Sequence, residues 1–151
     1  MVDKAKRLED VITTMFSTVL HMDIWRNPAA MVASQGQPHI SASVQVSGAW
    51  IGIVVLTIPT TLAETLSANM FDIDEDELTT EDVEDAMGEL ANIAGGSFKS
   101  SMEGHCNLGL PVVASGANYS VRFPGSVEIA KFGFECEDEC FHATIIEKED
   151  Q

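Results

Sequence analysis

The chain has 151 residues, of which 45% are hydrophobic and 21% charged, and these values are those of a single globular domain over residues 1–151. The formal net charge of −16 excludes general binding to nucleic acid, because phosphate backbones require Lys and Arg. No apolar run approaches the roughly 20 residues that cross a bilayer, and polar residues interrupt the apolar stretch near the N-terminus. We therefore expect a cytoplasmic protein without a membrane partner.

The first part of the chain predicts a helix followed by two strands. Apolar residues recur at helical spacing from Leu8 to Met22, which predicts an amphipathic helix with one buried face. A loop with Gly and Pro breakers separates this helix from residues 39–59. That segment alternates and is rich in β-branched residues, so it predicts two strands that are joined near residue 47 and ended by Pro59.

Two helices are predicted next. Thr60 or Thr61 caps a short helix, whose inward residues are Leu62, Leu66 and Met70. An acidic loop then leads to a long helix over residues 80–103. Thr79 is its expected N-cap, acids in its first turn suit the helix dipole, and Gly104 is its expected terminator.

After residue 104 the pattern changes to that of strands. Alternation or β-branched enrichment, separated by turn residues, marks four segments: 110–116, 118–123, 126–136 and 140–146. Helices combined with consecutive strands predict an α+β (layered α/β) fold, in which long helices pack on an antiparallel-rich sheet.

The long helix has two contrasting faces. At about 100° per residue, six apolar residues form a core stripe: Val83, Met87, Leu90, Ala94, Phe98 and Met102. Asp85, Glu89, Asn92 and Gly96 fall on the opposite side, where Glu89 and Asn92 are neighbours one turn apart. Such a pair is a weak motif by itself, since exposed Glu and Asn are common on helices.

Two glycines weaken the interior of this helix. Gly95 and Gly96 each cost roughly 0.5–1 kcal/mol relative to Ala. Gly96 shares the face of Glu89 and Asn92, where a missing side chain lets another surface approach closely. Gly95 lies nearer the core stripe, and either glycine could instead permit close packing inside the protein.

Acidic residues gather beside this helix. Ten of the 24 acids lie between Asp72 and Glu89, and no Lys or Arg occurs between Arg26 and Lys99. Acidic runs are usually solvated surface. A partner that meets this face should offer at least one cation.

The arrangement D-x-x-x-E-x-x-N, here Asp85, Glu89 and Asn92 within DAMGELANIAGG, resembles the signature of the CheC/CheX chemotaxis phosphatases. The order of first helix, strand pair ending in Ile-Pro, short helix, motif helix and a closing strand set that begins with PVVASG is similar over nearly the whole chain. The first helix offers no second E-x-x-N, so the chain resembles the CheX branch, with one site per chain. This resemblance implies a CheC-like fold.

The resemblance also implies an activity: hydrolysis of the aspartyl phosphate on a phosphorylated CheY-type response regulator, which terminates a chemotaxis or other two-component signal. Asn92 would position the attacking water, and Glu89 would form a salt bridge to the receiver domain's active-site lysine. Asp85 and Gly96 would serve partner contact. No metal or cofactor is expected on this chain, because the response regulator would bind the required Mg²⁺. CheX-type members resemble homodimers joined through sheet edges, so a homodimer is expected.

Two other interpretations remain open. A binding module, acting as an adaptor or sequestering protein, could dock on a receiver domain without accelerating dephosphorylation, since the presence of both residues does not establish a rate. The spacing C-x₃-C-x-H of Cys136, Cys140 and His142 suggests zinc or redox sensing. The strand pattern on either side instead predicts a hairpin tip with two neighbouring thiols, and no fourth ligand is evident.

Overall fold

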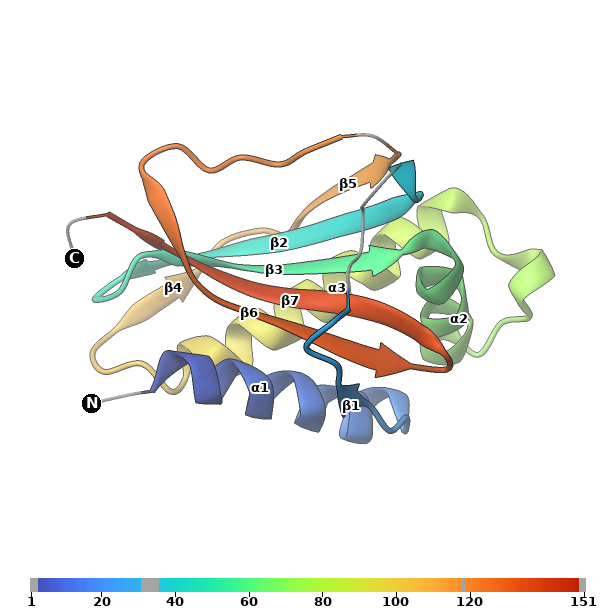
Figure 1. Cartoon of the computed structure of the whole chain (residues 1–151), viewed down its shortest axis with the longest axis horizontal. Coiled ribbons are helices and arrows are strands. Elements are labelled where there is room, and N and C mark those ends of the chain that lie inside the picture. The colour runs from blue at the N-terminus through green and yellow to red at the C-terminus, as the bar shows by residue number, and fades with distance from the viewer. Residues whose placement is uncertain (1–2, 31–35, 118, 150–151) are drawn as a thin grey trace.

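The computed structural model describes residues 3–30, 36–117 and 119–149, and these form one antiparallel seven-stranded sheet with helices against it (Figure 1). The order of strands across the sheet is β1-β6-β7-β3-β2-β4, and β5 also pairs with β2, at residues 39–43, whereas β4 pairs with residues 46–48 at the end of that strand. The strands are β1 (Trp25–Arg26), β2 (His39–Gly48), β3 (Gly52–Pro59), β4 (Cys106–Leu108), β5 (Val112–Gly116), β6 (Ser126–Cys136) and β7 (Glu139–Lys148). The expected α+β fold with an antiparallel-rich sheet is confirmed.

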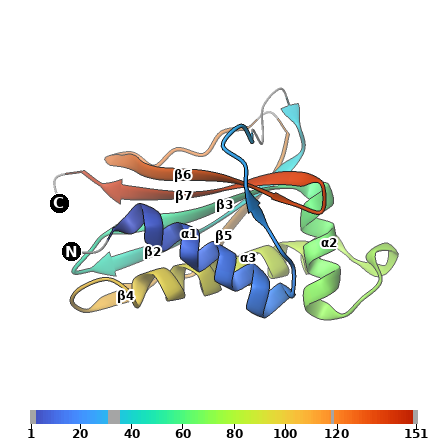
Figure 2. The ribbon, with the colours of Figure 1, turned by 60° about the horizontal axis from the view of Figure 1, so that its bottom comes forward.

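Three α-helices pack against the sheet: α1 (Lys4–Met15), α2 (Thr60–Phe71) and α3 (Thr80–Lys99). Figure 2 shows α1 and α3 side by side on one face of the sheet, with α2 at its end. A π-helical turn, η1 (Phe16–Leu20), continues α1, and a short 3₁₀ turn, η3 (Glu75–Glu77), lies between α2 and α3. The opposite face of the sheet carries loops instead of α-helices in the described part of the chain.

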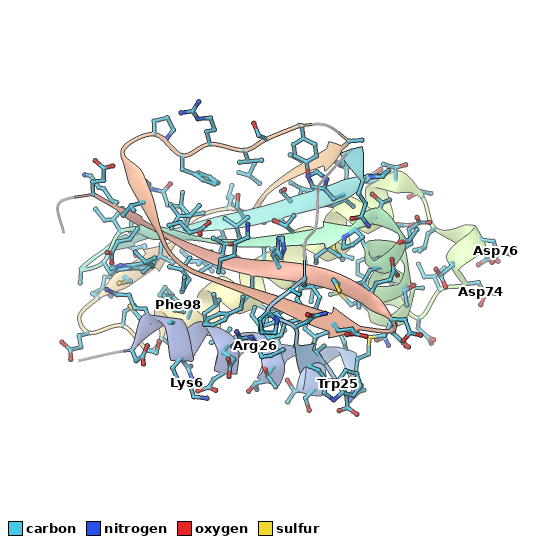
Figure 3. The ribbon with its side chains drawn as sticks, in the orientation of Figure 1. Lys6, Trp25, Arg26, Asp74, Asp76 and Phe98 are labelled. Atoms are coloured by element: carbon cyan, nitrogen blue, oxygen red, sulfur yellow. The ribbon has the colours of Figure 1, made fainter. Side chains whose placement is uncertain are left out.

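Aromatic side chains fill the layer between the helices and the sheet. Phe141 of β7 stacks on Phe16 at 4.8 Å and on Phe134 of β6 at 5.2 Å between ring centroids. At the other end of this layer lies Phe98 of α3, which is labelled in Figure 3. Its ring centroid is 5.4 Å from that of Trp50, in the turn between β2 and β3. Offset and tilted aromatic pairs of this kind stabilise the fold beyond the effect of the apolar area that they bury. All six residues of the predicted core stripe are buried, although Met102 lies beyond the end of α3.

The N-terminus of α3 is capped as expected. The Thr79 hydroxyl accepts a hydrogen bond from the Asp82 backbone N–H at 3.1 Å, and the Asp82 carboxylate accepts one from the Thr79 N–H at 3.0 Å. This reciprocal capping box satisfies two donors that the first turn of a helix leaves free. The start of α3, and with it the angular position of each residue along the helix, is therefore fixed by local chemistry.

The end of α3 differs from the prediction. The helix stops at Lys99 rather than residue 103, because the hydroxyls of Ser100 and Ser101 bond back to the carbonyl oxygens of Ser97 and Phe98. Such local bonds compete with the helical pattern. Gly104, with φ of +84°, comes after further turns and leads into β4.

Other local predictions were wrong. Residues 119–123 form no strand, and Asn118 of that predicted segment lies outside the described residues. Helix α2 begins after Pro59 without a side-chain cap, so neither Thr60 nor Thr61 is its N-cap. Strands β1 and β4 were missed because two- and three-residue strands are too short to show alternation.

Candidate functional site

The face of α3 that points away from the sheet carries the four residues of the motif face, which we define as Asp85, Glu89, Asn92 and Gly96. Asp85 and Glu89 are exposed, while Asn92 and Gly96 are partly exposed. Within the described residues neither the Glu89 nor the Asn92 side chain has a hydrogen bond or ion pair. The helix thus presents a carboxylate and an amide, one turn apart, whose hydrogen-bonding capacity is not used inside the protein.

The two glycines of α3 have different surroundings. A Cβ on Gly95 would lie 2.2 Å from Cγ1 of Val44 in β2, a separation that real atoms do not reach. A Cβ on Gly96 would meet only the Cδ2 atom of Leu108, at 3.8 Å, which is ordinary contact. Gly95 therefore permits the close approach of helix and sheet. This is the internal packing that the sequence left open as an alternative for the two glycines. Internal packing does not require Gly96 to lack a side chain.

Three kinds of contact hold α3 in place beneath the motif face. Its apolar stripe packs on the sheet, the Arg7 guanidinium of α1 donates to the Ser97 carbonyl oxygen at 3.2 Å, and the Lys99 ammonium donates to the Cys106 carbonyl oxygen at 3.4 Å. A site on a helix held this way is more rigid than one on a loop. Glu89 and Asn92 therefore keep a fixed spacing.

The electrostatic character of the α3 side is acidic. The described ion pairs involve Lys4, Lys6 and Arg26, which pair with Glu147, Glu9 and Asp10 on α1 and β7. None of the acids from Asp72 to Glu89 forms an ion pair within the described part of the chain. Figure 3 shows Asp74 and Asp76 at the far end of the molecule, beyond α2 and away from Lys6. This surface attracts a cationic partner group.

The register of the β6–β7 hairpin separates the residues of the C-x₃-C-x-H spacing. Cys136 is opposite Glu139 and Cys140 is opposite Glu135, so the two cysteines point to opposite faces of the sheet. Cys136 lies in the core, whereas the Cys140 sulfur accepts a hydrogen bond from the Asn27 amide. The expected pair of neighbouring thiols is wrong, and these residues do not converge on one point.

Two histidines and a tyrosine lie together on the helix-free face of the sheet. His39 stacks on Tyr119 at 4.2 Å between ring centroids, and the Tyr119 hydroxyl bonds to Ser41 at 3.1 Å. These residues and His142 line a cavity of about 260 Å³. Burial, opposed by a hydrogen bond to the Ala30 carbonyl oxygen, lowers the pKa of His142. No periodic pattern predicted this grouping, since its members come from separate strands and a loop.

Neither a membrane span nor a metal cluster is found in the described ranges. No helix there is long and apolar enough to cross a bilayer. No three or more His, Cys, Asp or Glu residues there are grouped so that they could hold a metal ion.

The sequence of the chain matches the model of a known protein family. The model described as chemotaxis phosphatase CheX matches residues 40–135, which is more than half of the chain and includes all of α3. No curated protein sequence matches the chain.

Solved structures with the same fold cover nearly the entire chain. The chemotaxis protein CheX from Vibrio vulnificus matches with a TM-score of 0.77 and 20% identity, over 97% of each chain. A CheC-like superfamily protein from Shewanella sp. PV-4 matches with a TM-score of 0.74 and 20% identity, again over 97% of each chain. The CheX–CheY–BeF₃–Mg²⁺ complex from Borrelia burgdorferi matches with a TM-score of 0.75 and 15% identity, over 99% of this chain and 100% of the other. At these identities the likeness establishes the fold, which is CheC-like as expected.

Proposed function

Because the chain belongs to the CheX family of chemotaxis phosphatases, we propose that it hydrolyses the aspartyl phosphate of a CheY-type response regulator. One observation carries this proposal: Glu89 and Asn92 stand one turn apart on the exposed side of α3, and both are without a partner within the described residues. The complex of the Borrelia burgdorferi relative with CheY supports the choice of partner. The reaction would end a chemotaxis or other two-component signal.

Glu89 would dock the partner. Its exposed carboxylate has no competing cation in the described part of the chain, so it is available to a lysine beside the phosphorylated aspartate. An ion pair that becomes desolvated at an interface fixes the relative orientation of two proteins. Asp85, one turn earlier, would make a peripheral contact, and Gly96, one turn beyond Asn92, would leave room for the partner's surface.

Asn92 would act on the phosphoryl group itself. Its Oδ1 atom would accept a hydrogen bond from a water in line with phosphorus, and its Nδ2 would donate to a phosphoryl oxygen. The water oxygen would bond to phosphorus while the bond from phosphorus to the aspartate oxygen breaks, and the electron pair would return to the carboxylate. The water proton would leave with inorganic phosphate. A loose transition state needs positioning rather than a strong base, and Mg²⁺ on the receiver would neutralise phosphoryl charge.

The test is loss of phosphate from candidate receivers. Each would be phosphorylated with a small phosphodonor, freed of it, and followed with and without the protein. We expect faster phosphate release, and we expect Asn92→Ala to reduce the rate by about a hundredfold or more, as loss of a positioned polar group does. Asn69→Ala provides a matched control, because Asn69 is an exposed asparagine on α2.

The outcomes separate the two functional classes. Binding of a receiver without any change in its phosphate lifetime would favour a non-catalytic binding module. Full activity of Asn92→Ala beside an active wild type would contradict the mechanism while leaving the phosphatase function in place.

We also propose a homodimer joined through a sheet edge. On the outer side of β6, β1 covers only Phe134 and Glu135, so residues 126–132 have no strand partner there within the described residues. An unpaired row of backbone N–H and C=O groups is a template for pairing with another chain. Sedimentation at micromolar concentration would detect the dimer, and a monomer at every concentration would contradict it.

A further inference from the structure

One exposed segment beside α3 combines an uncharged sequence with two strongly exposed hydrophobic side chains. Residues 107–116, which span the connection from β4 to β5, contain no charged residue in a chain of net charge −16. Leu110 is 88% exposed and Val112 is 65% exposed, the two largest exposures among the described large hydrophobic side chains. Single exposed apolar residues are ordinary, but Leu110 and Val112 are separated only by the exposed Pro111, and neighbouring exposed apolar side chains are typical of a contact surface.

This segment runs along one flank of α3. A Cβ placed on Gly88 would meet Val113 at 3.5 Å and Pro111 at 3.6 Å, and one placed on Gly95 or Gly96 would meet Leu108. The residues 107–116 therefore follow the helix from Gly88 to Gly96, which is just over two turns. We call this segment the apolar flank.

The apolar flank lies on the Asn92 side of the motif face. At about 100° per residue, Asn92 projects about 40° from Gly88 around the helix, whereas Glu89 projects about 100° from it. Asn92 thus lies between the carboxylate of Glu89 and the flank. A partner domain that brings a phosphoryl group to Asn92 and a cation to Glu89 would also cover Pro111 and the exposed residues next to it.

We propose that Leu110 and Val112 form the apolar part of the docking surface for the same receiver domain that Asn92 acts on, an inference that rests on the proposed function. The partner would carry an uncharged apolar area next to its phosphorylated aspartate and lysine. Continuity with the motif face favours this occupant. A second copy of the chain would pair instead through β6, at the opposite edge of the sheet order.

The acidic face and the apolar flank would contribute to recognition in different ways. The acidic face around Glu89 attracts and orients a cationic partner, and this attraction weakens with salt. The apolar flank excludes water around Asn92, so it contributes to affinity in a way that salt does not weaken. Residues that surround and exclude water from a polar contact strengthen it in this manner.

The experiment compares Leu110→Ser and Val112→Ser with the matched control Val121→Ser. Val121 is also exposed, at 42%, and belongs to the loop before β6. With a phosphorylated receiver as substrate, we expect Leu110→Ser to raise KM about tenfold with kcat changed less than twofold, the size of effect of a moderate interface anchor. Val112→Ser should raise KM severalfold, and Val121→Ser should leave both constants unchanged.

The controls separate failure of this inference from failure of the proposed function. An active wild type with an unchanged KM for Leu110→Ser would overturn the inference alone. A wild type that binds the BeF₃-loaded receiver without hydrolysis would overturn the phosphatase function, and a tenfold weaker binding by Leu110→Ser would still support the flank. No binding of any receiver by the wild type would overturn both. Loss of self-association by Leu110→Ser with an unchanged KM would assign the flank to a second copy and overturn it as a receiver contact.

Discussion

Gly95 of α3 faces Val44 of β2 so closely that a Cβ on the glycine would lie 2.2 Å from Cγ1 of the valine. Because Gly95 has no side chain, α3 packs closer to β2 than any other residue would allow. This contact positions the helix that carries Glu89 and Asn92. The adjacent Gly96 has no such constraint, since its nearest neighbour for a Cβ is Leu108 at 3.8 Å. Two glycines in sequence thus serve two different surfaces.

Replacement of each glycine by alanine should change stability in opposite directions. Gly95→Ala inserts a methyl group into a filled site and should destabilise the fold by about 1–3 kcal/mol. Gly96→Ala removes a helix-weakening residue without a clash and should stabilise it by about 0.5–1 kcal/mol. Urea unfolding of the two variants measures both effects, and equal destabilisation would contradict this account of the packing.

The phosphatase activity of Gly96 variants gives a second measurement at the same pair of glycines. Gly96→Gln introduces a good helix former but fills the space beside Asn92, so it should lower kcat/KM without destabilising the protein. Gly96→Ala should act less strongly than Gly96→Gln. A fully active Gly96→Gln variant would show that no partner surface approaches this position.

The elements that repeat over many residues were predictable from the sequence. The core stripe of α3 follows the helical period from Val83 to Phe98, about four turns, and the β2–β3 pair follows β-branched enrichment over residues 39–59. The same helical period places Glu89 and Asn92 together on the face opposite the stripe.

The features that depend on distant pairing were not predictable. β1 has two residues and forms only because β6 lies beside it. The opposite orientation of Cys136 and Cys140 follows from the two-residue turn Glu137–Asp138, whose positive φ values of 50° and 64° are rare outside Gly, Asn and Asp. The sequence of the apolar flank likewise does not indicate a contact surface, since its residues are ordinary ones for a strand and a turn. Only its position along α3 places it beside Asn92.

Loss of the Glu89 charge should weaken docking. Glu89→Gln preserves the shape and the helix propensity of the residue but removes the ion pair with the partner's lysine. We expect kcat/KM to fall about tenfold to a hundredfold at low salt, and we expect the remaining activity to depend less on salt than that of the wild type. Glu84→Gln is the control: it makes the same change of net charge at an exposed position of α3 outside the motif face. An equal loss in both variants would indicate a general field effect instead of a specific contact.

The thiols should differ in reactivity. Burial, with smaller contributions from Glu137 and Glu139, raises the pKa of Cys136 to about 11. At pH 8 its thiolate fraction is then on the order of one in a thousand, and the thiolate is the reactive form. Iodoacetamide should label the half-buried Cys140 faster than Cys136, and all three cysteines should react alike in denaturant. Mild oxidation of the folded protein should not link Cys136 to Cys140, and a peptide containing that disulfide would contradict the register.

Glu147 should make the stability of the fold depend on pH. One carboxylate oxygen accepts hydrogen bonds from the Lys4 ammonium at 2.9 Å and from the Trp50 indole N–H at 2.6 Å, which ties α1 and the β2–β3 turn to β7. Burial acts to raise the pKa of Glu147, but the two hydrogen bonds and the charge of Lys4 outweigh it, so the pKa lies below its ordinary value. The folded state therefore holds this proton less tightly than the unfolded state.

The sign of the effect follows from that lowered pKa. The contribution of Glu147 is complete above the ordinary glutamate pKa of about 4.3 and is lost as the pH falls through the lower folded value. The difference in unfolding free energy between the wild type and Glu147→Gln should thus be largest near neutral pH and should shrink below about pH 4. Glu149→Gln, at an exposed residue just beyond β7, should show no such dependence. Urea unfolding from pH 7 to pH 3 measures the three proteins, and a difference that stays constant across this range would mean that the charge of Glu147 contributes nothing to the contact between α1 and β7.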